Sequence, residues 1–71
     1  MKKPTLTIAA QDANLRLINE FIKHGADINS RNRLGLTPLS CAAAYGHAET
    51  VEFLLEHGAD PNILDRDGLS P

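Results

Sequence analysis

The chain has 71 residues, of which 42% are hydrophobic and only 4% aromatic, and its formal net charge is −2. A chain of this length forms one small domain, whose core here must be built from aliphatic side chains and alanine. Seven basic residues scattered among nine acidic ones argue against nucleic-acid binding through a broad basic surface. No apolar run is long enough to span a membrane. The single cysteine allows no internal disulfide and is typical of an intracellular, most often cytoplasmic, protein.

Two short helices are predicted in the first part of the chain, because apolar residues recur there at helical spacing. The positions expected to face inward are Leu6, Ala9 and Ala10 in the first helix and Ile18, Phe21 and Ile22 in the second.

The second part of the chain predicts the same pair of helices with clearer boundaries. Thr37 is a suitable N-cap for a helix that begins at Pro38, and Gly46 ends this helix in the left-handed conformation. A second helix is expected over residues 48–57, where Gly58 stops it. The residues expected to face inward are Leu39, Ala42, Ala43, Val51, Leu54 and Leu55, while Glu49, Glu52 and Glu56 face outward.

The two parts are copies of one unit. The hexapeptide HGADIN at residues 24–29 returns as HGADPN at 57–62, and RLGLTP at 33–38 returns as RDGLSP at 66–71. Each copy begins 33 residues further on (24 to 57, 33 to 66). A constant repeat of this length predicts stacked units, each of which buries its apolar face against the next.

The second unit closely resembles one ankyrin repeat. The resemblance rests on the stretch NRLGLTPL at residues 32–39 and GAD at 58–60, with the pairs Ala-Ala, Gly-His and Leu-Leu between them. It implies an all-α repeat protein, an ankyrin-type solenoid of stacked helix–turn–helix units joined by short hairpin loops.

On this resemblance the chain divides into three parts. Residues 1–31 form a degenerate, capping-like N-terminal repeat, residues 32–64 a full repeat, and residues 65–71 the start of a third, truncated repeat. Because Pro71 stands at the first helical position of that third repeat, one hypothesis is that the chain is a structural fragment of a longer ankyrin array whose functional site lies elsewhere.

Several positions depart from the family's pattern. Ser40 replaces the histidine of the usual Thr-Pro-Leu-His, so the customary Thr–His hydrogen bond cannot form. Asn32 stands where Asp is usual and keeps a turn-forming side chain without its charge. In the first unit Ala13 occupies the position of Gly46, and this degeneration is typical of an N-terminal capping repeat.

No catalytic, cofactor or metal site is expected, so we predict that the protein is not an enzyme. His47 and Glu49 form the His-x-Glu half of a zinc-deaminase signature, but the Pro-Cys-x-x-Cys half is missing. We expect His47 to cap the turn between the helices. His24 and His57 occupy equivalent helix ends, where a structural role is favoured, and Cys41 is expected to be a small buried packing residue.

The resemblance implies a protein–protein interaction module or scaffold, in which the hairpin tips and the exposed side of the first helices form a concave surface that binds another protein. No binding to nucleic acid or to a membrane is expected. Leu34 is predicted to be exposed, and Leu36 to pack on the neighbouring repeat. The candidate partner-binding residues are Arg31, Arg33, Leu34, Ala44, Tyr45, Arg66 and Asp67.

Overall fold

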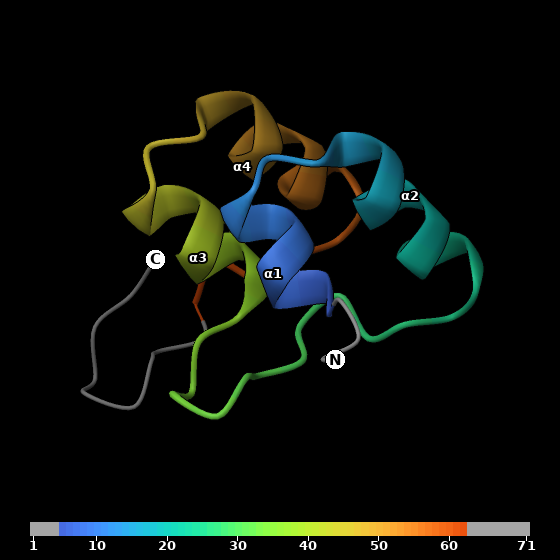
Figure 1. The fold of residues 1–71 in the computed structure, drawn as a ribbon, viewed down its shortest axis with the longest axis horizontal. Helices are drawn as coiled ribbons and strands as arrows, with labels where there is room; N and C mark the ends of the chain where they lie inside the picture. Colours follow the sequence, from blue (N-terminus) through green and yellow to red (C-terminus); the bar gives the residue numbers. More distant parts are fainter. Residues whose placement is uncertain (1–4, 63–71) are drawn as a thin grey trace.

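The computed structural model describes residues 5–62, which form four helices and no strand. The helices are α1 (Leu6–Gln11), α2 (Leu15–Lys23), α3 (Pro38–Ala44) and α4 (Ala48–Glu56). Figure 1 shows α1 and α3 side by side, each followed by the second helix of its own unit. The predicted all-helical class and the two helix pairs are confirmed. No helix in the described part of the chain is long and apolar enough to cross a membrane.

Threonine side chains start the first helix of each unit. Thr5 Oγ1 accepts the N–H of Ile8 at 3.2 Å, and Thr37 Oγ1 accepts the N–H of Ser40 at 3.1 Å. Pro38 follows Thr37 directly, where its missing N–H costs nothing. Since Thr5 stands at the position of Pro38 in the 33-residue repeat, α1 begins one residue later in its unit than α3 does.

A serine takes over the role of the histidine that the family usually carries. Ser40 Oγ lies 3.0 Å from Thr37 Oγ1, and both residues are buried. Every buried side-chain nitrogen and oxygen among residues 5–62 has a hydrogen-bond partner. A Thr–Ser bond thus stands where the resemblance implies a Thr–His bond, and it ties the turn together.

The core lies where α1 packs against α3. Three of the buried residues of these two helices are alanines, and Ala9, Ala10 and Ala42 are 1%, 0% and 0% exposed. Because alanine projects little beyond the helix backbone, these short helices approach each other closely. Leu36 is half-buried and packs against the same core. The remaining buried hydrophobic residues are Leu6, Ile18, Leu39, Cys41, Leu54 and Ala59.

The loops that follow α2 and α4 are also joined. Asp27 and Asp60 each follow Gly-Ala and accept a backbone N–H two residues on, at 2.9 and 2.8 Å. In addition, Asn29 Oδ1 accepts the N–H of Asp60 at 2.9 Å, a bond between the two units. This bond fixes the loop of one repeat against that of the next.

Two residues predicted to face inward are exposed. Ala43 is exposed, and Leu55 is 42% exposed, whereas Ala10, the equivalent of Ala43 in the first unit, is completely buried. The reason is position in the stack: α3 covers the first unit, whereas no described element covers the far side of α3 and α4. We call this far side, lined by Leu39, Ala43, Val51, Leu55 and Pro61, the open face.

The turn between the two helices of each unit needs a left-handed residue. Gly46 supplies it in the second unit with φ = 73°, but Ala13 occupies the same place in the first unit with φ = 55°. A side chain in this conformation costs roughly 1–2 kcal/mol, because Cβ crowds the following carbonyl oxygen. The first unit therefore carries a strained residue that the second does not.

We expect Ala13→Gly to raise the free energy of unfolding by about 0.5–1 kcal/mol, because relief of this strain outweighs the greater chain entropy of glycine. Gly46→Ala is the matched control and is expected to lower it by about 1 kcal/mol, since nothing lies within 4 Å of an added Cβ and only the backbone is affected. Urea melts followed by circular dichroism measure both. No stabilisation by Ala13→Gly would contradict this account of the turn.

The stacked arrangement predicts that alanine to leucine destabilises the fold at Ala10 but not at the equivalent position Ala43. Ala10→Leu inserts three carbons into the contact between α1 and α3 and should destabilise the fold by about 1–3 kcal/mol. Ala43→Leu should change stability by no more than about 0.5 kcal/mol, because Ala43 is exposed. Equal losses in urea melts of the two variants would show that the described stack is wrong.

Candidate functional site

The loop between α2 and α3 is organised by one asparagine. Asn32 Oδ1 accepts the N–H groups of Leu34 at 2.9 Å and Leu36 at 3.0 Å. The N–H of Asn32 itself donates to the carbonyl oxygen of Leu36 at 2.9 Å, and Gly35 adopts φ = 82° at the bend. Asn32 thus has the turn-forming role predicted for it. Its bonds to the N–H groups of Leu34 and Leu36 hold Leu34 at the tip of the loop.

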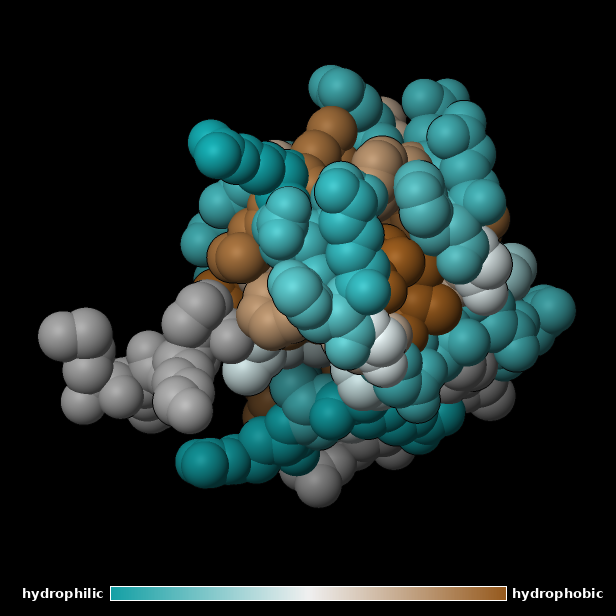
Figure 2. All heavy atoms as spheres, turned by 90° about the vertical axis from the view of Figure 1, so that its right-hand side faces the viewer, coloured by the Kyte–Doolittle hydropathy of each residue, from teal (hydrophilic) through white to brown (hydrophobic). Residues whose placement is uncertain are grey.

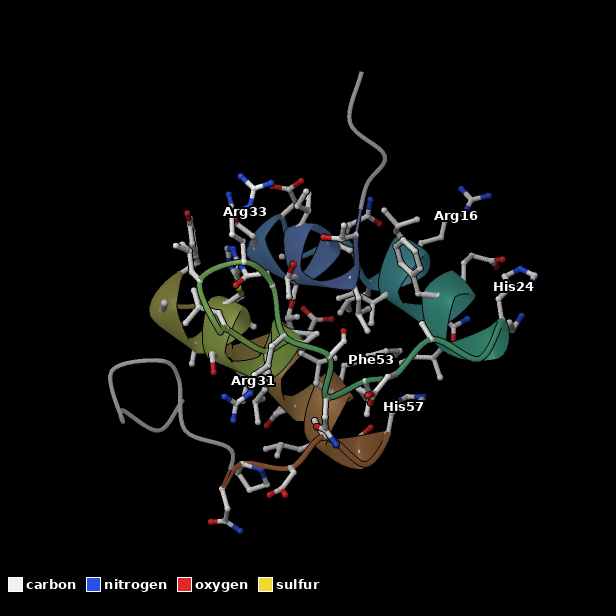
Figure 3. The ribbon with its side chains drawn as sticks, turned by 90° about the horizontal axis from the view of Figure 1, so that it is seen from below. Arg16, His24, Arg31, Arg33, Phe53 and His57 are labelled. Atoms are coloured by element: carbon white, nitrogen blue, oxygen red, sulfur yellow. The ribbon has the colours of Figure 1, made fainter. Side chains whose placement is uncertain are left out.

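All five candidate partner-binding residues in the described range are exposed. Leu34 is 59% exposed and Tyr45 is 58% exposed, and the first of these values confirms the predicted exposure of Leu34. Figure 3 shows that Arg31 and Arg33 extend from the loop in different directions, so the structure does not gather them into one basic cluster. The other exposed candidate is Ala44, at the end of α3. Arg66 and Asp67 lie outside the described residues.

Tyr45 stands beside a histidine that joins the two units. The Tyr45 and His47 rings are stacked, with centroids 6.2 Å apart and an interplanar angle of 21°. His47 Nε2 lies 2.9 Å from the carbonyl oxygen of Gln11, to which the ring N–H donates. The prediction that His47 caps the turn was wrong: it is the N-cap residue of α4 but makes no side-chain capping bond.

The equivalent position in the first unit explains the difference. Asn14 caps α2, because its Oδ1 accepts the N–H of Leu17 at 3.1 Å. The longer ring of His47 instead reaches back to α1, where an exposed helix-end carbonyl is available. The change from Asn to His at one repeat position is the signal in the sequence that could have predicted this contact between the units.

The other two histidines have local partners. His57 Nδ1 lies 2.8 Å from the carbonyl oxygen of Phe53, and the two rings stack with centroids 4.2 Å apart. His24 lies 3.7 Å from Glu20 in an exposed pair one helical turn apart. Both are the C-cap residues of their helices, at the equivalent helix ends that the sequence predicts. Among residues 5–62, no three His, Cys, Asp or Glu side chains lie close enough together to hold a metal ion.

Cys41 lies in the core, as predicted, with 3% of its surface exposed. Burial raises the pKa of its thiol above the ordinary value, because the charged thiolate is poorly solvated there. Since the thiolate is the reactive form, this position favours packing over chemistry.

We expect the Cys41 thiol of the folded protein to react with Ellman's reagent at neutral pH at least tenfold more slowly than in urea. The raised pKa also means that the folded state holds the proton more tightly than the unfolded state does. The free energy of unfolding should therefore fall as the pH rises through the alkaline range. Equal labelling rates in the folded and unfolded states would contradict the buried position.

Comparison with known proteins agrees with this architecture. The family model described as "Ankyrin repeats (3 copies)" matches residues 2–71. The chain is also similar to the E3 ubiquitin-protein ligase XBAT33 of Arabidopsis thaliana, with 42% identity over 49 residues. That match covers 69% of this chain and 10% of the relative, so the chain matches only a small part of the longer protein. The chain belongs to the ankyrin repeat family.

Proposed function

We propose that the chain is a non-enzymatic, intracellular module that binds another protein through a concave surface formed by the loop tip and the exposed side of the first helices. Ankyrin repeats typically bind proteins, which supports the general class. The observation that carries the proposal is the exposure of Leu34 and Tyr45, each more than half accessible and each held by ordered neighbours.

The candidate binding residues are held in place by hydrogen bonds and helix packing before a partner binds. The loop tip is held by the bonds of Asn32, and the end of α3 is held by the contact of His47 with α1. A partner therefore orders little of this surface on binding, which preserves affinity. Tyr45 and Arg33 are residue types that often dominate binding energy, and exposed Leu34 offers apolar area for a partner to cover. Ala44 is small enough to let a partner approach α3.

A second candidate role is a structural one, as part of a longer ankyrin array whose binding site lies elsewhere. The open face favours it, because Ala43 and Leu55 there are accessible although their equivalents in the first unit are better covered. An autonomous module should fold and bind alone, whereas a purely structural part should do neither.

We predict that Tyr45→Ala and Arg33→Ala together weaken partner capture at least tenfold, because such anchors commonly contribute 1.4 kcal/mol or more. The measurement is quantitative mass spectrometry of proteins retained from cell extract by the immobilised chain. Circular dichroism should show unchanged helicity, because both side chains are exposed.

Arg16→Ala is the control, since Arg16 is an exposed arginine on α2, away from the loop tip. Proteins that the double variant loses and Arg16→Ala retains are the specific partners. If the double variant captures the same proteins in the same amounts as the wild type, these two residues do not form the binding surface.

A further inference from the structure

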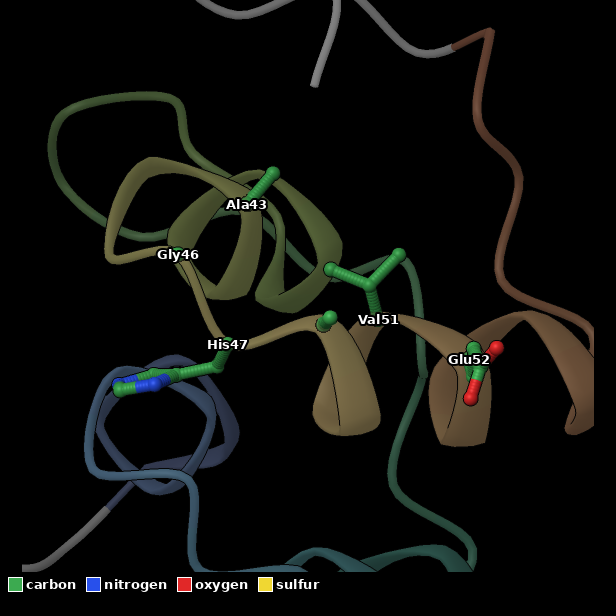
Figure 4. Close-up of a pocket in the computed structure, with 6 residues that line it drawn as sticks. Ala43, Gly46, His47, Val51 and Glu52 are labelled. Carbon is green, nitrogen blue, oxygen red and sulfur yellow. The ribbon is translucent and has the colours of Figure 1, made fainter.

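We draw no further inference here: the strongest candidate, the open face, where Ala43 and Val51 line two adjoining hollows of about 380 and 160 Å³ (Figure 4), lies away from the mostly hydrophilic side nearest α2 (Figure 2), and nothing in the structure shows what covers it.

Discussion

The close contact between α1 and α3 is the interaction on which the rest of this structure depends. These helices have 6 and 7 residues, far below the length of about 12–15 at which isolated helices become marginally stable in water. Neither can exist without a neighbour to pack on. The small side chains of Ala9, Ala10 and Ala42 let the two helix backbones approach each other closely. This close approach allows the two units to stack.

Two polar contacts between the units support the alanine contact at opposite ends of the helix pairs. His47 reaches the end of α1 through Gln11, and Asn29 accepts the N–H of Asp60 in the loop after α4. Contacts between alanines do little to fix the position of one helix along the other, because their side chains are small and identical. Hydrogen bonds at both ends fix how far one unit is shifted along the other. The position of the loop tip and of Tyr45 relative to the first unit follows from this register.

The sequence predicted the helix pairs, the repeat length, the caps at Thr37 and the exposure of Leu34, because these depend on local chemistry and on a pattern visible twice. The sequence-based prediction failed where the burial of a residue depends on the neighbouring unit that covers it. Ala43 and Leu55 match buried residues by position, yet their exposure is decided by the neighbouring unit. It also failed for His47, because the bond joins residues 36 positions apart and only the change from Asn14 to His47 between the repeats indicated it. The binding surface was predictable only as a set of exposed positions.

The central claim is that the two units fold as one because each depends on the contact between α1 and α3. Native-state hydrogen exchange of the backbone amides in these helices at increasing urea concentrations tests it most directly. The account predicts that the slowest amides of α1 and α3 exchange through a single opening with the same free energy and the same dependence on urea. If the amides of α1 exchange through a separate, lower-energy opening while those of α3 stay protected, the second unit folds without the first and the claim is wrong.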